Sequence, residues 1–260
     1  MWNDLLNMEC FDKNGYADHW SNRMNKISVI MACGRGKDQA QVVVNKVRNM
    51  NPDVDLEVIV SSPGYQLHDA VNVQDEMIGN SKAMAQCYPH CTGDFIVWWS
   101  DEAWSEWYCF GKMRKFLLEN EKQEPLIGEF FTTDLKNNRT SPDVTLICEV
   151  VGRQYARWGM ASRKTLNQIG GFFDPEFISH WADPDLSFRC WDAGGRVVIV
   201  RDAEIKVCDI GDQLHKANHE KYMDHDANHF INKWKEKYPI MAERPWPEWN
   251  QGREIPICGL

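Results

Sequence analysis

The sequence predicts an α/β fold in which parallel strands are covered by helices on both faces. Short runs that are apolar throughout recur along the first half of the chain, at residues 27–32, 56–60 and 95–99. Segments with helical spacing separate these runs. Strands without a polar side are typical of a parallel sheet that is buried on both faces, and the alternation with helices indicates β-α-β units.

Turn residues delimit the elements of the first half. The first strand is followed by GRG (34–36), and the helix after it is followed by NP (51–52). The second strand is followed by SSPG (61–64), and the third by SDE (100–102). Gly and Pro end regular elements because of their special backbone preferences. Helices are expected at residues 38–50, in a polar stretch that continues to about residue 87, and at residues 105–120.

The second half mixes strands with three further helices. Strands are expected at residues 126–131, 144–151, 196–200 and 204–208, and helices at residues 163–169, about 183–193 and 214–238. Pro184 lies at an early helical position, with acids in the same first turn. The tail, rich in Pro and Trp, is expected to wrap over the body as a coil. We therefore divide the chain into an N-terminal arm (1–25), a main domain (26–238) and a C-terminal tail packed on it (239–260).

Composition and charge exclude several classes of function. The chain has 260 residues, is 43% hydrophobic and carries a net charge of -9. This acidity argues against unspecific binding to nucleic acid or anionic lipid, because both need a basic surface. No apolar run approaches the roughly 20 residues of a membrane span, and the N-terminus lacks the pattern of a signal peptide. We therefore expect a cytoplasmic protein without a membrane span.

Nine cysteines are scattered along the chain without any C-x-x-C pair. Most lie in apolar segments, as buried free thiols do, which favours a reducing compartment and no structural disulfides. A zinc site formed by Cys87, His90 and Cys91 is disfavoured, because the chain has no second pair of ligands at the usual spacing.

Three loops collect where the predicted parallel strands end, and open α/β sheets bind ligands at this edge. The loops are residues 33–35, 61–63 and 100–102. The third carries Asp101 and Glu102, which we call the acidic pair. Adjacent carboxylates suit a divalent cation that takes oxygen ligands and is shared with a phosphate. The alternative is that Asp101 caps a helix that starts near Trp104, and this stretch alone leaves both interpretations open.

A second acidic signal lies in residues 159–195, which contain Asp174, Asp183 and Asp185. The last two open a predicted helix. A carboxylate there can act as a general base over a ligand. The alternative is a structural role, with Asp185 pairing to Arg189 one helical turn on. We expect the structural role for Asp185 and the catalytic role for Asp183.

Four stretches of sequence together resemble GT-A-type nucleotide-sugar glycosyltransferases of the large inverting family 2, over about residues 27–236. KISVIMACGRG is similar to the opening strand and nucleotide loop of that family. GNSKAMAQCYPHCTGDFIVWWSDE is similar to the region that ends in its DXD motif. GMASRKTLNQIGGFFDPEF resembles its G-G-F-D-E-x-F stretch, and HWADPDLSFRCWDAGG resembles its E-D-x-D-L motif. The order and spacing of the pieces are specific, although no single piece is.

The resemblance implies a GT-A fold, with a mixed central sheet and helices on both faces. It implies metal-dependent inverting transfer of a sugar from a nucleotide-diphosphate donor to an acceptor hydroxyl. Asp183 falls on the catalytic base, and Ser100-Asp101-Glu102 falls on the DXD motif. The implied metal is Mn or Mg, with Asp101, Glu102 and His215 as candidate ligands and Glu102 favoured for direct contact. The implied donor is a UDP-sugar first, with GDP- and TDP-sugars as alternatives.

The resemblance also assigns the other residues of the site. Contacts to the nucleotide are expected from Ala32, Cys33, Arg35, Ser61, Ser62, Lys82, Ser100 and Asp101. Contacts to the sugar substrates are expected from Trp158, Gly159, Trp181 and Ala182, where the flat Trp faces suit a sugar ring. The expected partners are a nucleotide-sugar and a carbohydrate or glycolipid acceptor. The N-terminal arm and the tail can form a homodimer contact or cover the acceptor cleft.

Three departures from the family pattern leave the nucleotide open. The second strand of the family usually ends in Asp residues that contact the nucleoside, whereas here it ends in SSP (61–63). An Arg-Asn pair of the family is replaced by MA (84–85). The acidic residue that precedes the catalytic base in the family is replaced by Ala182.

Two other functions therefore remain open. One is a sugar-phosphate nucleotidyltransferase, because MACGRGKDQ loosely resembles the Gly-rich opening loop of that group. Against it, the Arg and Pro of that loop are missing, and ADPDLSFR has no counterpart there. The other is a non-catalytic nucleotide-sugar-binding module with a GT-A shell. The missing Asp after the second strand supports it, whereas the presence of Asp101, Glu102 and Asp183 together opposes it.

The motif H-x-A-N-H occurs twice in the last predicted helix, at residues 215–219 and 225–229. On a helix, these four histidines lie within about a third of the circumference, given about 3.6 residues per turn. They can form a zinc site or a solvated, half-buried face, and we favour the face because it is the commoner arrangement.

Overall fold

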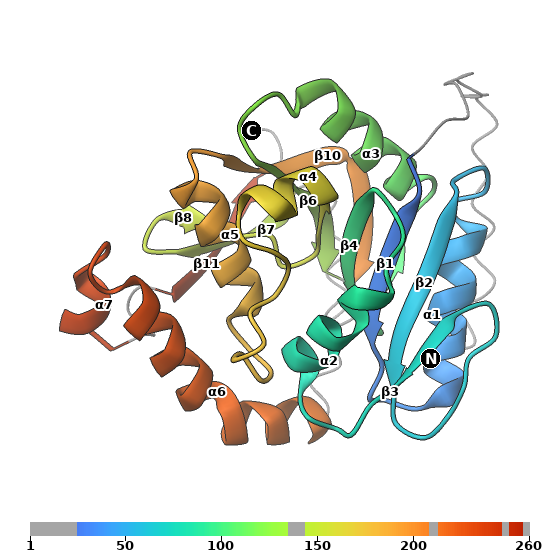
Figure 1. Cartoon of the computed structure of the whole chain (residues 1–260), viewed down its shortest axis with the longest axis horizontal. Coiled ribbons are helices and arrows are strands. Elements are labelled where there is room, and N and C mark those ends of the chain that lie inside the picture. Colours follow the sequence, from blue (N-terminus) through green and yellow to red (C-terminus); the bar gives the residue numbers. More distant parts are fainter. Residues whose placement is uncertain (1–24, 135–143, 208–212, 246–249, 257–260) are drawn as a thin grey trace.

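A computed structural model of the chain describes residues 25–134, 144–207, 213–245 and 250–256. Almost all of the expected N-terminal arm lies outside these residues. Within the described part, an eight-stranded sheet runs through the molecule, with helices on both faces, and a second, three-stranded sheet lies beside it (Figure 1).

The strand order of the main sheet is β3-β2-β1-β4-β9-β6-β10-β5. Its strands are β1 (Ile27–Ala32), β2 (Leu56–Ser62), β3 (Val71–Gln74), β4 (Phe95–Ser100), β5 (Ala103–Ser105), β6 (Leu126–Asp134), β9 (Gly159–Ser162) and β10 (Arg196–Val207). All share one direction except β9, which is antiparallel between β4 and β6, and β5, which is antiparallel to β10 at the edge. The expected parallel strands are confirmed at β1, β2 and β4, and the sheet is mixed, as the family resemblance implied.

The helices follow the predicted order with shifted ends, except that the polar stretch expected to be helical up to about residue 87 contains strand β3 and is helical only in α2. They are α1 (Lys37–Asn49), α2 (Asn80–Cys87) with the 3-10 turn η2 (Tyr88–His90), α3 (Cys109–Asn120), α4 (Arg163–Gln168), α5 (Ala182–Asp192), α6 (Gln213–Trp234) and α7 (Ile240–Glu243). The helix expected from residue 105 begins at Cys109, because residues 103–105 pair with β10 as strand β5.

Side chains of the central strands alternate between two hydrophobic cores. Along β4, Phe95, Val97 and Trp99 point into the core under α1 and α3, whereas Ile96 and Trp98 point into the core under α2, α4, α5 and α6. Successive residues of a strand face opposite sides of the sheet. An uninterrupted apolar strand therefore fits only a sheet that is covered on both faces.

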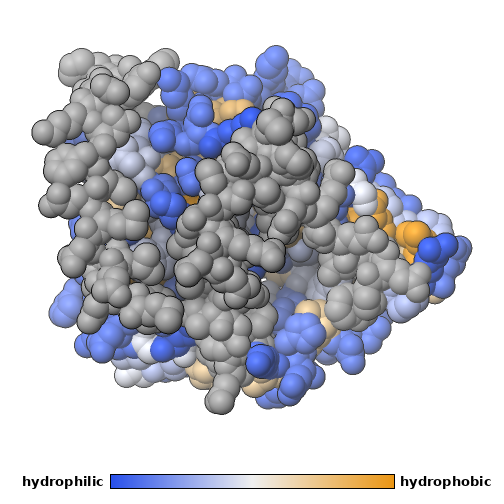
Figure 2. Space-filling model, turned by 180° about the vertical axis from the view of Figure 1, so that it is seen from behind, coloured by the Kyte–Doolittle hydropathy of each residue, from blue (hydrophilic) through white to orange (hydrophobic). Residues whose placement is uncertain are grey.

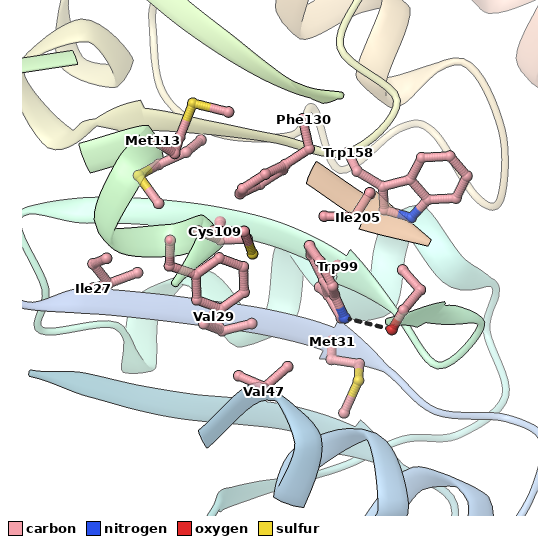
Figure 3. Packing of buried hydrophobic residues seen from close by; sticks show 14 of the residues in the cluster. Ile27, Val29, Met31, Val47, Trp99, Cys109, Met113, Phe130, Trp158 and Ile205 are labelled. Carbon is pink, nitrogen blue, oxygen red and sulfur yellow. Dashed lines mark hydrogen bonds between the residues drawn. The ribbon is translucent and has the colours of Figure 1, made fainter. Parts of the chain in front are cut away.

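Large aromatic rings fill the first core (Figure 3). The ring of Trp99 meets Phe110 and Phe130 edge-on, with centroids 5.1 Å and 5.5 Å apart. Its indole N–H donates a hydrogen bond to the carbonyl oxygen of Ala103 at 3.0 Å. This bond satisfies the one polar atom that the buried indole brings into the core, and it ties the turn after β4 to the strand.

Small residues explain a strand that the sequence does not predict. Gly159–Ser162, for which no strand was expected, fills the gap between β4 and β6 as β9. A Cβ atom at Gly159 would lie 2.4 Å from Cζ2 of Trp98 and 2.8 Å from the carbonyl oxygen of Gly128. Glycine is therefore needed here for close packing.

The second sheet has the order β11-β7-β8, with β7 (Val144–Val150), β8 (Arg153–Gln154) and β11 (Asn250–Pro256). Two expectations are wrong in this part of the chain. The tail was expected to be a coil, yet it contains α7 and the strand β11, which pairs along all of β7. Two strands were expected at 196–200 and 204–208, yet β10 is one strand with an irregularity between Val200 and Glu204.

The surface on the side opposite to that of Figure 1 is mostly hydrophilic where it is coloured, with small separate hydrophobic patches (Figure 2). Among the described helices, none combines the length and the apolar character that a membrane span requires.

Candidate active site

A cleft of about 300 Å³ opens beyond the carboxyl ends of β1 and β4. Its walls come from the ends of β1 and β4, the segment that leads from β3 into α2, the segment before β9, the turn that leads into α5, and helix α6. Its lining includes Ala32, Gly34, Arg35, Asp75, Met77, Ser81, Ser100, Asp101, Glu102, Tyr155, Arg157, Trp158, His180, Trp181, Asp183 and Met223. Two acidic signals that lie some eighty residues apart in sequence therefore border the same space.

The acidic pair follows β4 directly, and Asp101 is 2% exposed. The helix-cap interpretation of Asp101 is wrong, because β5 follows it and α3 starts only at Cys109. Instead, the side chain of Arg35 contacts both acids. One guanidinium nitrogen pairs with Asp101 Oδ1, the other lies 3.1 Å from Glu102 Oε2, and the backbone N–H of Arg35 points at Asp101 Oδ2 at 3.3 Å.

Asp183 lies in the first turn of α5 and lines the same cleft as the acidic pair. Burial raises the pKa of its carboxyl to about 7, against the opposing effects of a hydrogen bond from its own backbone N–H and of the Arg157 charge. Asp185 has the structural role that we expected. It is fully buried and accepts hydrogen bonds from Arg189 and Trp234 at 2.9 Å and 3.0 Å.

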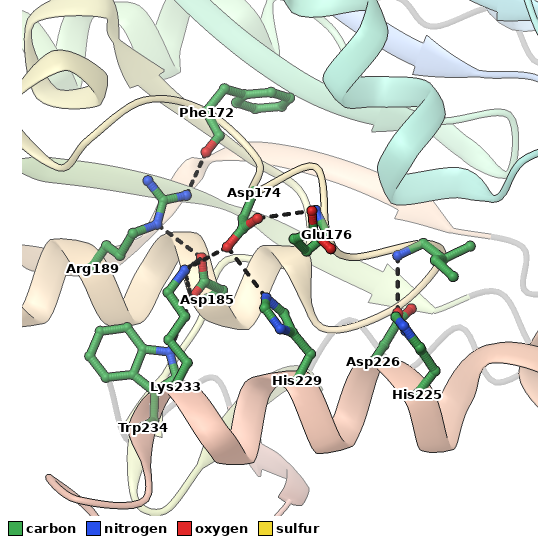
Figure 4. A network of polar contacts seen from close by, with 11 residues as sticks. Phe172, Asp174, Glu176, Asp185, Arg189, His225, Asp226, His229, Lys233 and Trp234 are labelled. Carbon is green, nitrogen blue, oxygen red and sulfur yellow. Dashed lines mark hydrogen bonds and ion pairs between the residues drawn. The ribbon is translucent and has the colours of Figure 1, made fainter.

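A larger polar network holds α5 against α6 (Figure 4). Lys233 of α6 binds the carboxylates of Asp174 and Asp185, at 2.9 Å and 3.0 Å respectively. His229 approaches Asp174 at 3.4 Å. These contacts fix the helix that carries Asp183 and account for Asp174 without a role in catalysis.

Sequence reasoning missed a buried acid behind Asp183. Glu129 lies in β6, is 3% exposed and accepts a hydrogen bond from the Gln154 amide at 2.5 Å. Burial first, with a smaller contribution from the charge on Asp183, raises the pKa of Glu129 to about 8, against hydrogen bonds from Gln154 and the Arg157 backbone and against the Arg157 charge. The signal was available, because this acid is the single charge in the apolar run LIGEFF.

Arg157 was also missed. It lines the cleft, and its guanidinium lies 4.2 Å from the ring centroid of Trp158. Trp158 in turn donates its indole N–H to the hydroxyl of Ser100 at 3.0 Å. Arg157 therefore brings a second positive charge, besides Arg35, to a cleft that several acids border.

Asp75 supplies a carboxylate near the place where the family pattern lacks one. It follows β3, which pairs with β2 so that Ser62 lies opposite Gln74. Asp75 lines the cleft, is 7% exposed and accepts the backbone N–H of Met77 at 2.8 Å. Sequence reasoning missed it because the strand VNVQ is short and polar at every second residue.

The turn before α5 is held by α6. The buried carboxylate of Asp226 accepts backbone N–H groups from Ile178, Ser179 and His180, at 2.8–3.0 Å. Trp181 follows with a left-handed backbone (φ 66°) and donates its indole N–H to the sulfur of Met223 at 3.1 Å. Asp226 is the variable residue of the second H-x-A-N-H motif and Met223 stands in no motif, so the sequence pattern did not indicate this support.

The structure brings eight of the expected site residues to the cleft: Ala32, Arg35, Ser100, Asp101, Glu102, Trp158, Trp181 and Asp183. Six others lie outside its lining: Cys33, Ser61, Ser62, Lys82, Gly159 and Ala182. Cys33 is completely buried, which raises the pKa of its thiol well above the usual value, and Ser62 donates its hydroxyl to the carbonyl of Tyr65. The side chain of His215 lies outside the described residues.

The histidines and cysteines do not form a metal centre in the described part of the chain, where no three His, Cys, Asp or Glu side chains converge. His225 contacts Asp226, His229 approaches Asp174, and His219 lies against His180. His219 and His225 are exposed and His229 is half-buried, which agrees with the face interpretation for these three. The described cysteines are all free and buried, as expected.

The acidic pair does fit a divalent metal by its donor chemistry. Mg and Mn prefer oxygen ligands, and Mg in particular is usually held by one or two carboxylates together with substrate phosphates. Asp101 and Glu102 offer such oxygens at the cleft, although Arg35 contacts them in this structure.

Comparisons with known proteins identify the fold. No protein-family model matches the sequence, and a comparison with curated proteins found no match either. Among solved structures, the mannosyltransferase PcManGT from Pyrobaculum calidifontis, in complex with GDP-Man and Mn2+, has a TM-score of 0.56 at 13% identity, covering 81% of this chain. TarS of S. aureus has a TM-score of 0.55 at 12% identity, covering 80% of this chain.

The likeness concerns only part of these two proteins, because the match spans 65% of the first and 40% of the second. At such low identity it shows the fold alone. The central mixed sheet and the helices on both of its faces agree with these neighbours. The chain therefore has the GT-A fold.

Proposed function

We propose that this chain is a metal-dependent inverting glycosyltransferase, which moves a sugar from a nucleotide-diphosphate donor to an acceptor hydroxyl. The observation that carries the proposal is the placement of two separate acidic groups on one cleft. The acidic pair follows β4, and Asp183 opens α5. Groups with different surroundings at one site can perform different steps of a reaction.

The acidic pair provides the donor side of the proposed site. Asp101 and Glu102 would hold the divalent metal, which when bound supplies Lewis-acid stabilisation of the departing diphosphate. Ser100 and Ala32 border the same region. The complex of PcManGT with GDP-Man and Mn2+ supports a nucleotide-sugar and a divalent metal here. We propose UDP- and GDP-sugars as the first donors to compare.

Asp183 provides the acceptor side. A general base works best when its pKa lies near the working pH, and burial raises the pKa of Asp183 to about 7. In the proposed step, the Asp183 carboxylate takes the proton of the acceptor hydroxyl while that oxygen bonds to the anomeric carbon. The bond from this carbon to the diphosphate oxygen breaks at the same time, and the electron pair leaves with the diphosphate. Attack from the opposite face inverts the anomeric centre.

Trp158 and Trp181 both line the cleft. Both are nearly buried, with 4% and 5% of their surface exposed. Aromatic faces bury the apolar side of a sugar ring while the sugar hydroxyls stay free to form hydrogen bonds. We propose that these two residues hold the transferred sugar or the acceptor over Asp183.

Thermal-shift screening of the purified protein tests the donor side. UDP, GDP and TDP are compared with and without Mn2+, using the variant Asp101→Asn/Glu102→Gln as the matched control. We expect one diphosphate to raise the melting temperature only when Mn2+ is present, and only with the acidic pair intact. Hydrolysis or transfer of the matching nucleotide-sugar, followed by NMR of the product anomer, then tests catalysis and inversion.

Each competing function has its own result. Release of pyrophosphate from a nucleoside triphosphate and a sugar phosphate would identify a nucleotidyltransferase. Binding of a nucleotide-sugar without any turnover, across a panel of carbohydrate and glycolipid acceptors, would identify a non-catalytic module. An unchanged melting temperature with all three diphosphates would contradict the proposed donor site.

A further inference from the structure

The guanidinium of Arg35 bridges the two acids that would hold the metal. One of its nitrogens pairs with Asp101, and the other lies 3.1 Å from Glu102 Oε2. The Arg35 backbone N–H contacts the second oxygen of Asp101 at 3.3 Å. The side chains of Arg35, Asp101 and Glu102 are only 14%, 3% and 13% exposed. The ion pairs of Arg35 therefore lie mostly buried in the cleft wall and differ from solvent-exposed ion pairs on the surface.

A metal ion and this guanidinium compete for the same oxygens. Both oxygens of Asp101 already face a donor of Arg35, as does Oε2 of Glu102. A divalent cation that approached while Arg35 stayed in place would also meet a positive charge within a few ångströms. Repulsion between like charges is strong where water is mostly excluded. The metal can therefore bind the acidic pair well only after the guanidinium leaves.

Arg35 has a second natural partner. Arg is suited to bidentate contacts with phosphate as well as with carboxylate, because its planar fork matches both groups. Arg35 lines the cleft in which the proposed diphosphate would lie. Its loop has glycine on both sides, and Gly36 has a φ of 116° with nothing within 4 Å of a Cβ built on it. The space beside Gly36 is thus open, and no side chain at that position hinders a movement of the Arg35 guanidinium.

We infer that Arg35 is a built-in counter-cation of the acidic pair, which a divalent metal replaces only when a nucleoside diphosphate takes over the guanidinium. Metal and diphosphate then bind as a coupled pair, and each strengthens the binding of the other by the same factor. In the free protein, Arg35 neutralises the acids and keeps a metal from binding alone. This inference rests on the proposed function, since it concerns the same donor site.

Direct titration with Mn2+ tests the inference without any measurement of activity. The electron paramagnetic resonance signal of free Mn2+ gives its dissociation constant, with and without saturating UDP or GDP. We compare the full chain with Arg35→Ala and Arg35→Gln, and use Arg48→Ala as the control. Arg48 lies in α1, where its guanidinium contacts the carbonyl of Asp69, and it does not line the cleft. Circular dichroism confirms that each variant is folded.

In the absence of nucleotide, we expect Arg35→Ala and Arg35→Gln to bind Mn2+ about tenfold more tightly than the unaltered chain, which is within the usual range of coupling between sites. Arg48→Ala should bind Mn2+ like the unaltered chain. The diphosphate should strengthen Mn2+ binding in the unaltered chain and do so less in the Arg35 variants. Equal Mn2+ affinity with and without Arg35 would overturn the inference.

The inference and the proposed function fail in different ways. If no diphosphate binds to any of the proteins, the proposed function fails, while the nucleotide-free comparison still decides the competition between Arg35 and Mn2+. If a diphosphate binds without Mn2+ to the unaltered chain and Arg35→Ala abolishes this binding, Arg35 serves the phosphate in place of a metal. That result would overturn the inferred exchange of partners and leave the donor site in place.

Discussion

The Oδ2 atom of Asp226 accepts the backbone N–H of His180 at 2.8 Å, and this bond joins helix α6 to the wall of the cleft. The same carboxylate accepts the N–H groups of Ser179 at 2.8 Å and Ile178 at 3.0 Å. Asp226 is completely buried. Three backbone N–H groups of one turn therefore have a single side chain as their hydrogen-bond partner. This side chain comes from a helix that begins more than thirty residues later in the sequence.

Replacement of Asp226 tests how far α6 supports the site. Asp226→Ala should lower the free energy of unfolding by about 3 kcal/mol or more, because each buried donor without a partner costs about 1–3 kcal/mol. Asp226→Asn should cost less, because its amide oxygen can keep the bonds to Ser179 and His180. Asp224→Asn, an exposed position on the same helix, is the control. Urea denaturation gives the three values, and a loss in Asp224→Asn as large as in Asp226→Ala would contradict the assignment.

Removal of the proposed base separates chemistry from binding. Asp183→Asn keeps the size of the side chain but cannot take a proton, so kcat should fall by about 10²–10⁴-fold, the usual contribution of a general base. The dissociation constant of the donor, measured by calorimetry, should stay within about twofold, since the acidic pair is untouched. Asp192→Asn, at the exposed end of the same helix, should leave both quantities unchanged. Full turnover by Asp183→Asn would rule out Asp183 as the base.

The pH dependence of transfer should report on Asp183. Only the ionised carboxylate can accept a proton, and its pKa is raised to about 7. The value of kcat/KM should therefore rise about tenfold per pH unit in acidic solution and level off above about pH 7. Arg157 lowers this pKa. In Arg157→Gln, the bend in the profile, which is the pH at which kcat/KM levels off, should therefore move to higher pH. Arg153→Gln, an exposed arginine four residues earlier, should not move it. A bend that is the same in all three proteins would contradict the link between Arg157 and Asp183.

Much of the frame was predictable from the sequence, because buried strands and their turns leave local signals. FIVWW indicated β4 and the acidic pair at its end, and both are confirmed. The strands β3, β5 and β9 were not predictable from local pattern, since each is short and depends on its partner strand. Asp75 and Asp226 were missed for the same reason. Their roles arise only when distant parts of the chain meet.

Arg157 shows a different limit. The sequence contains many arginines, and nothing local distinguishes the one that stacks on Trp158 beside Asp183. Glu129 could have been found, since a charge inside an apolar strand needs either a partner or a proton. Its neighbours are Gln154, the Arg157 backbone and Asp183, and this environment leads to the last prediction.

Glu129 should make the folded protein less stable as the pH rises. Its pKa is about 8 in the folded protein, against an ordinary value of 4.5, so the folded protein binds this proton more tightly than the unfolded chain does. The stabilisation that the proton provides is complete below about pH 4.5 and is lost as the pH rises towards 8. In Glu129→Gln, the amide resembles the protonated acid at every pH. Its free energy of unfolding should match that of the unaltered chain at low pH.

The difference between the two proteins should appear in alkaline solution. Between pH 5.5 and pH 8.5, the unaltered chain should lose on the order of 3 kcal/mol relative to Glu129→Gln, because a tenfold change in proton affinity corresponds to about 1.4 kcal/mol. Comparison of the two proteins removes most of the titration of Asp183, which changes stability in the same direction, and leaves the part that comes from its coupling to Glu129. Glu124→Gln, an exposed position just before β6, should follow the unaltered chain. Urea denaturation at the two pH values measures these differences, and parallel pH curves for the unaltered chain and Glu129→Gln would show that Glu129 is already ionised in the folded protein at neutral pH.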